Sequence, residues 1–320
     1  MKLHGIIKFC LKTRVVSVLS MLSLLALTQV YSQSKPPKQA VTIGESGVKY
    51  LYNTWANSLF EQDIEMWQKM TSSYQQRKIR NELVSKKRNF PADVFMNGIP
   101  NLINLENLSM VSLTQNKVHA KAVFFGDLQL LQRGEGKTSK PAMLVRQSLY
   151  TIDFYAEDGW WKVGQAGVLD LRHQPELKKQ LLQYQFEPIK LPIVNQLPEL
   201  DPLVSEADYI GNVWVNTQGV EVDIIVNGIS LGSVAESEKA LLILGGLKLG
   251  KNTIKYRIKT PNNTSNSLVA AIEVFALSEK RGNKPIRLWS LEKSNKNRQP
   301  DINGFYSDSF MLTAEQASTL

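Results

Sequence analysis

Two polar residues in this sequence could act together as a general-base pair. His119 lies in an alternating run over residues 117–125, and Asp153 lies in a β-rich run over residues 145–157. A carboxylate that orients an imidazole is what a dehydratase or an isomerase needs in order to move a proton. Both residues could equally occupy ordinary solvent-facing positions on a strand. We therefore treat His119 and Asp153 as candidate catalytic residues on the condition that both line one cavity.

A set of aromatic residues could line such a cavity. Some recur at helical spacing near the start of the mature chain, and others lie on predicted strands. These candidate ligand-binding residues are Trp55, Phe60, Trp67, Phe124 and Tyr150. Trp160 and Trp161 are adjacent on a predicted strand, so their side chains must point to opposite faces. The outward one of the two is a candidate interface residue.

Several other kinds of site lack their sequence signals. The chain contains three histidines and one cysteine, Cys10, and no pair of histidines has a metal-ligand spacing. Neither a Gly-x-Ser-x-Gly nucleophile motif nor a glycine-rich phosphate-binding motif is present. The sequence therefore predicts no metal site and no cofactor.

Residues 1–32 have the pattern of a secretory signal. Basic residues precede an apolar run over residues 15–30, and Val30-Tyr31-Ser32 suits cleavage near Ser32. An uncleaved N-terminal membrane anchor is the alternative, but the run is shorter than the ~20 apolar residues that a spanning helix needs. We expect a periplasmic or extracellular protein that loses Cys10 with its leader and so contains no disulfide.

The charge of the chain argues against one class of partner. The formal net charge is +9, and it falls to +5 once the four basic residues of the leader are removed. The remaining charge is spread through segments of mixed sign, so nucleic acid is not a predicted partner. A mildly basic surface suits anionic components of a cell envelope better.

The first half of the mature chain predicts an α+β domain over residues 44–173, after a flexible lead-in at 33–43. Helical periodicity covers residues 48–72, with a break or a second helix beginning at Asp63, and a further helix covers residues 75–87. A strand and a long hairpin follow, and Asp158-Gly159 forms the turn of the hairpin. Helices followed by antiparallel strands are typical of the α+β class.

These elements resemble the NTF2-like (SnoaL-type) family. The resemblance rests on the aromatic helix with Trp55, Phe60 and Trp67, on the strand over residues 117–125, and on a hairpin that ends in Gly-Trp-Trp-Lys-Val. It implies helices that cap a conical cavity on a curved sheet, and an open sheet face through which a homodimer could form. It does not fix a function, because this fold serves many.

The second half changes its pattern. Residues 174–204 are proline-rich and predict a linker with one short helix, and residues 205–280 contain short β runs at regular spacing. These runs predict a β-sandwich, and residues 247–254 resemble a turn found in Ig-like bacterial modules. Residues 281–320 are polar, and we expect them to be largely disordered apart from a short edge strand at 286–289.

The missing catalytic motif and the appended sandwich favour an exported, non-enzymatic binding or assembly protein. Its partner would be another envelope or extracellular protein, a second copy of the chain, or a small ligand. One alternative is a dehydratase or isomerase that uses His119 and Asp153 in the cavity. The other is a carbohydrate-binding protein, for which the sandwich offers the aromatic residues Tyr209, Trp214 and Tyr256. An open cavity would favour the enzyme, and a cavity filled by aromatic side chains would favour the binding protein.

Overall fold

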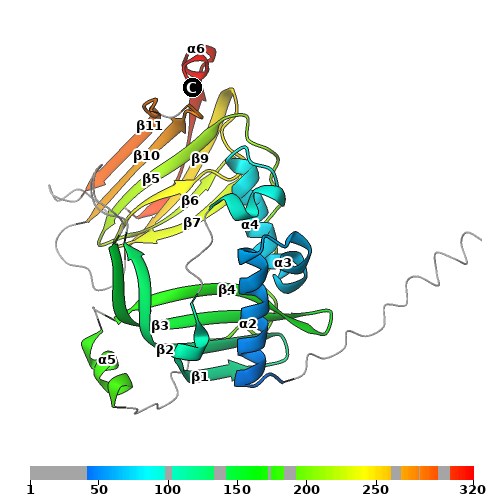
Figure 1. The fold of residues 1–320 in the computed structure, drawn as a ribbon. Coiled ribbons are helices and arrows are strands. Elements are labelled where there is room, and N and C mark those ends of the chain that lie inside the picture. Colours follow the sequence, from blue (N-terminus) through cyan, green and yellow to red (C-terminus); the bar gives the residue numbers. More distant parts are fainter. Residues whose placement is uncertain are drawn as a thin grey trace, which may run out of the picture.

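The chain forms a mixed, strand-rich fold with few helices and three four-stranded antiparallel sheets. The computed structural model describes residues 42–97, 103–132, 142–171, 174–183, 192–260, 268–280, 282–294 and 303–320. The expected leader and almost all of the lead-in lie outside these residues. Figure 1 shows one sheet beside the long helix α2, and two further sheets stacked together next to α4.

The first sheet has the strand order β1-β2-β3-β4. Its elements and those that precede it are α2 (Glu45–Phe60), α3 (Ile64–Met70), α4 (Ser73–Ser85), η1 (Ala92–Asn97), η2 (Leu105–Asn107), β1 (Ser109–Gln115), β2 (His119–Gln132), β3 (Ala142–Glu157) and β4 (Trp160–Asp170). The predicted break at Asp63 is confirmed, because its side chain accepts a hydrogen bond from the Met66 amide and caps α3. The predicted hairpin turn is also confirmed, with positive φ angles at Asp158 and Gly159.

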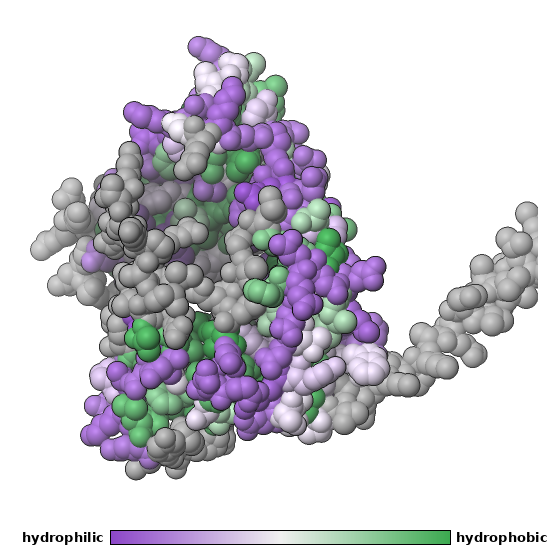
Figure 2. Space-filling view, in the orientation of Figure 1, coloured by the Kyte–Doolittle hydropathy of each residue, from purple (hydrophilic) through white to green (hydrophobic). Residues whose placement is uncertain are grey.

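The two faces of this sheet pack against different parts of the chain. Alternate residues such as Phe124 and Phe154 form a core with Val48 and Tyr52 of α2. The intervening residues face the other way, where Val123 and its neighbours pack against helix α5 (Pro175–Leu182). In Figure 2 hydrophobic residues reach the surface in the lower part of the molecule, near α5 and the adjoining strands. The face away from α2 is therefore partly covered by the same chain.

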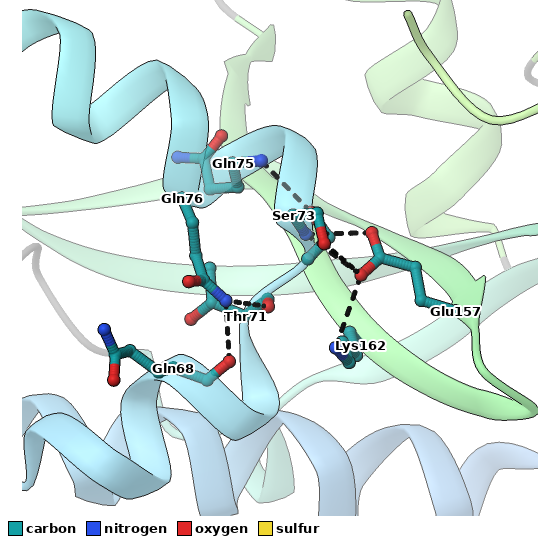
Figure 3. A network of polar contacts seen from close by, with 8 residues as sticks. Gln68, Thr71, Ser73, Gln75, Gln76, Glu157 and Lys162 are labelled. Atoms are coloured by element: carbon teal, nitrogen blue, oxygen red, sulfur yellow. Dashed lines mark hydrogen bonds and ion pairs between the residues drawn. The ribbon is translucent and has the colours of Figure 1, made fainter. Parts of the chain in front are cut away.

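A polar network joins α4 to the β3–β4 turn (Figure 3). The Glu157 carboxylate accepts hydrogen bonds from the backbone amide and the hydroxyl of Ser73, at 2.8 Å each, and lies 3.3 Å from Lys162. A carboxylate at the start of a helix satisfies amides that have no partner within the helix. Gln76 closes the network by donating to the carbonyls of Gln68 and Thr71. Glu157 therefore holds the start of α4 against the sheet.

The other two sheets have the strand orders β11-β10-β5-β8 and β12-β9-β6-β7. Their elements are β5 (Ile210–Gln218), β6 (Glu221–Val226), β7 (Ile229–Ala235), β8 (Glu238–Leu242), β9 (Gly250–Lys259), β10 (Val269–Leu277), β11 (Ile286–Ser294), β12 (Gly304–Leu312) and the short helix α6 (Ala314–Ser318). Inward residues of both sheets, among them Val213, Ile224 and Ile272, belong to one buried cluster. Two antiparallel sheets that share a core are compatible with a β-sandwich.

The expectation of a largely disordered tail over residues 281–320 is wrong. β11 pairs with β10, as expected for residues 286–289, and β12 pairs with β9 along its whole length. Phe310 and Leu312 of β12 are buried in the shared core. The polar residues that suggested disorder, such as Ser307 and Ser309, occupy the outward positions of this strand.

The expected linker is partly fastened to α4. Asn81 is buried, and its side chain donates to the carbonyl of Pro202 at 2.9 Å and accepts from the Val204 amide at 3.3 Å. Arg77 and Arg80 donate to the carbonyls of Asp201 and Val204 at 3.0 Å. We call residues 192–207 the connecting segment. Its backbone carbonyls accept hydrogen bonds from two basic side chains of α4, those of Arg77 and Arg80.

The same helix also contacts the C-terminal sheets. The Ala207 amide donates to the carbonyl of Val84 at 3.3 Å, and the Gly245 amide donates to the Ser85 hydroxyl at 2.8 Å. Lys87 forms an ion pair with Glu279 at 2.6 Å. Helix α4 therefore lies between the first sheet and the other two.

We expect Asn81→Ala to lower the free energy of unfolding by about 1–3 kcal/mol, because it leaves the Pro202 carbonyl and the Val204 amide without their partner. Urea denaturation measures this, and limited proteolysis should show faster cleavage within the connecting segment. Lys78→Ala, on an exposed position of the same helix, is the matched control. Equal stability of the two variants would contradict the fastening role of Asn81.

Candidate functional site

The structure brings His119 and Asp153 together. The distance from His119 Nε2 to Asp153 Oδ1 is 2.8 Å, and Lys121 Nζ lies 3.1 Å from the same oxygen. The imidazole stacks on the Tyr155 ring, with centroids 5.0 Å apart and an interplanar angle of 23°. His119 is only 2% exposed. Burial, and then the neighbouring charge of Asp153, raise the pKa of Tyr155 to about 12.

Both ring nitrogens of His119 are hydrogen-bonded to other groups of the chain. The backbone amide of Val194, in the connecting segment, donates to Nδ1 at 2.9 Å. An amide N–H can only donate, so Nδ1 carries no proton in this arrangement and Nε2 donates to Asp153. Asn116 reinforces the contact by donating to the Val194 carbonyl at 2.7 Å. His119 thus has no free nitrogen to offer a substrate.

The pair lies on the face of the sheet away from α2. His119 and Asp153 alternate with residues such as Ala120 and Phe154, which pack under α2. Strand geometry therefore brought the two side chains together, as the sequence suggested, but not into a cavity beneath the helices. The side chains of His119 and Asp153 are 3% and 15% exposed.

The aromatic candidates do not line a common cavity. Phe124 and Tyr150 are buried under α2, where the hydroxyls of Tyr52 and Tyr150 lie 3.1 Å apart. Burial raises the pKa of both tyrosines above its ordinary value. Trp55 packs against this core and donates to the Thr71 hydroxyl at 3.1 Å.

Two further aromatic candidates lie elsewhere. Trp67 is buried in a separate cluster with Leu59 and Leu83. Phe60 ends α2 and is 71% exposed, so it belongs to the surface of the molecule. Four of the five aromatic residues therefore pack in or against hydrophobic cores, and the fifth, Phe60, lies at the surface.

The two adjacent tryptophans point in opposite directions. Trp161 is 7% exposed and packs under α2, and Trp160 at the hairpin turn is 75% exposed. This is the alternation that a strand imposes. Trp160 is the outward residue of the pair.

The structure has a hollow that sequence reasoning missed. It lies on the outer face of the sheet β12-β9-β6-β7 and has a volume of about 760 Å³, within the size range of small-ligand sites. Asp223, Lys255, Arg257, Lys259 and Phe305 are among the residues that line it. Phe305 is 62% exposed.

The signal for this hollow is in the sequence. Along β9 the buried residues alternate with exposed or half-buried ones, and Lys251, Lys255, Arg257 and Lys259 all occupy outward positions. The net charge of the whole chain does not reveal this row of positive charges on one strand. Phe305 was missed because the tail was expected to be disordered.

The charges of the hollow are unevenly paired. Lys259 forms ion pairs with Asp223 at 2.7 Å and with Glu221 at 3.6 Å, and the Ser233 hydroxyl donates to Asp223. Burial alone would raise the pKa of Asp223, but the hydrogen bonds from Lys259 and Ser233 outweigh it, so that pKa is below its ordinary value. Among the residues that the structure describes, none forms an ion pair with Lys255 or Arg257.

Two other kinds of site are not found in the described part of the chain. No three histidine, cysteine, aspartate or glutamate side chains gather there as a metal would require. No helix within the described ranges combines the length and the apolar character needed to span a membrane. Comparisons with known protein families, with curated proteins and with solved structures gave no match to this chain.

Proposed function

We propose that the chain is an exported, non-enzymatic binding or assembly protein of the cell envelope or the extracellular space. In this proposal residues 44–173 form an NTF2-like domain, and an Ig-like sandwich begins near residue 205 and extends through β12. The observation that supports the proposal most strongly is the state of His119. Its two nitrogens are held by Val194 and Asp153, and its ring is buried. A general base needs a free nitrogen within reach of the substrate proton.

The rival reading as a dehydratase or isomerase needs an open cavity that contains His119 and Asp153. The aromatic residues beneath α2 are packed against one another, and the His119–Asp153 pair lies on the other side of the sheet. These observations favour a positioning role for the pair, in which it holds the connecting segment against β2. A binding function requires no catalytic base.

The hollow on the outer face of β12-β9-β6-β7 is the recognition surface in this proposal. Lys255 and Arg257 are exposed there, and neither forms an ion pair with a described residue. Exposed cations that form no ion pair attract a ligand of opposite charge and guide its approach. The ligand we propose is therefore an anionic component of the envelope or the extracellular matrix.

A charge-reversal experiment tests this function. We expect immobilised anionic polymers (polygalacturonate, dextran sulfate, polyglutamate or polyphosphate) to retain the wild-type chain in a salt-sensitive manner. The double variant Lys255→Glu/Arg257→Glu should bind at least about tenfold more weakly, because two attractive charges become repulsive. Circular dichroism would check that the variant folds.

The matched control is Lys239→Glu/Lys248→Glu, which changes the net charge equally at exposed positions away from the hollow. We expect it to bind like the wild type. If none of the four polymers bound, or if the control lost as much affinity as the double variant, the proposal would be overturned.

A further inference from the structure

The outer face of the sheet that bears the hollow presents one row of four different side chains across four strands, of which the first three line the hollow. Arg257 of β9 is directly opposite Phe305 of β12 on one side and Asp223 of β6 on the other. Asp223 in turn is opposite Ser233 of β7. Directly opposed residues have their side chains on the same face of a sheet and close enough to contact one ligand. The row therefore offers an aromatic ring, a guanidinium, a carboxylate and a hydroxyl, in that order.

Within this row Arg257 is the charged group that forms no ion pair in the described structure, although its positive charge contributes to the lowered pKa of Asp223. Lys259 occupies one carboxylate oxygen of Asp223 and the Ser233 hydroxyl occupies the other. Asp223 is thus already satisfied, and no ion pair joins it to Arg257 in the described structure. A guanidinium can hold a carboxylate or a similar oxyanion through two parallel hydrogen bonds. Lys255, the next outward residue on β9, adds a second positive charge beside it.

Phe305 indicates a second property of the ligand, an apolar face in addition to a negative charge. Its ring is 62% exposed although it stands next to a cation on a folded strand. An exposed aromatic ring beside a charged group offers a ligand both an apolar surface and an opposite charge. A simple anion would make no use of this ring.

We propose that the hollow binds an acidic saccharide, with the apolar face of one sugar ring against Phe305 and its carboxylate on Arg257. The inference deepens the proposed function and rests on it. A pyranose ring has an apolar face and hydroxyl groups at its rim, and the ion-paired groups Lys259 and Asp223 lie where those hydroxyls can hydrogen-bond. The volume of about 760 Å³ accommodates a short oligosaccharide.

The geometry disfavours two other anionic ligands. An extended acidic peptide characteristically binds by adding a strand to a sheet edge, whereas this hollow lies over a sheet face. Nucleic acid sites neutralise many phosphates and stack several bases. Here Phe305 is the one exposed aromatic ring among the described residues that line the hollow, whereas a nucleic acid site needs several.

Isothermal titration of the full chain with trigalacturonate tests the inference. We expect Arg257→Ala to weaken binding at least about tenfold, since it removes a charge-assisted hydrogen-bond pair. Phe305→Ala should weaken it about three- to tenfold, and Phe305→Tyr should bind like the wild type. The neutral trisaccharide of galactose and the triglutamate peptide should each bind at least about tenfold more weakly than trigalacturonate.

The outcomes separate this inference from the function on which it rests. If triglutamate bound as tightly as trigalacturonate, or if Phe305→Ala had no effect, charge alone would be recognised and the saccharide would be the wrong ligand class. If trigalacturonate failed to bind while an anionic polymer still bound through Lys255 and Arg257, the inference would fail and the proposed function would stand. Failure of both ligands would overturn both.

Discussion

We expect the replacement of Leu312 with alanine to lower the free energy of unfolding of the C-terminal sheets by about 2–5 kcal/mol, the cost typical of removing a buried leucine side chain from a core. Leu312 ends β12, is fully buried and packs in the core between the two sheets. Urea denaturation followed by tryptophan fluorescence would measure the change, because Trp214 and Trp289 lie in these sheets.

Met311 provides the matched control for this prediction. It is the preceding residue on the same strand and points to the outer face, where it is 54% exposed. Met311→Ala should change the free energy of unfolding by no more than about 0.5 kcal/mol. If Leu312→Ala proved equally mild, residues 304–312 would not be an integral strand of the fold.

The second large effect concerns His119. We expect His119→Ala to lower the free energy of unfolding by about 2–4 kcal/mol, because it leaves a cavity, removes one of the partners of Asp153 and leaves the Val194 amide without its acceptor. The connecting segment near Val194 should be cut faster by proteases, since its attachment to β2 is lost. Retention on anionic polymers should equal that of the wild type, because His119 is not among the residues that line the hollow.

Two controls make the His119 prediction sharp. Lys117→Ala lies just before the same strand at an exposed position and should leave stability unchanged. Asp153→Asn keeps the shape of the side chain and can still accept from Nε2, so it should cost less than His119→Ala. A His119→Ala variant as stable as the wild type would contradict the positioning role of the histidine.

Local signals in the sequence predicted the start of α3 and the turn between β3 and β4. Asp63 caps a helix and Asp158-Gly159 forms a tight turn through contacts between near neighbours in the chain. Such short-range chemistry can be read directly from residue order. The alternation along strands likewise placed Trp160 and Trp161 on opposite faces.

The role of His119 could not be predicted, because it depends on a distant segment. Strand alternation correctly placed His119 on the face of the sheet opposite to Phe124. The amide that donates a hydrogen bond to the His119 ring, however, belongs to Val194, 75 positions further along the chain. Because the backbone of Val194 makes this contact, no side chain in the sequence indicates it. A buried histidine with both nitrogens satisfied and a catalytic histidine look alike in a single sequence.

The hollow was missed for a related reason. The tail over residues 281–320 is polar overall, and composition alone made residues 304–312 resemble part of a disordered segment. Their inward residues, including Phe310 and Leu312, gain burial only by pairing with β9. Without that pairing Phe305 has no cation beside it, and the basic residues of β9 have no aromatic neighbour.

The most direct test of the account is to locate the bound ligand by two-dimensional NMR of the full chain. We expect titration with the anionic polymer that is best retained to shift the amide signals of Lys255, Arg257 and Phe305, and to leave those of His119, Asp153 and Val194 unchanged. Shifts centred on His119 and Asp153, with the β9 and β12 signals unchanged, would contradict binding at the hollow. The His119–Asp153 pair would then again be the candidate active site.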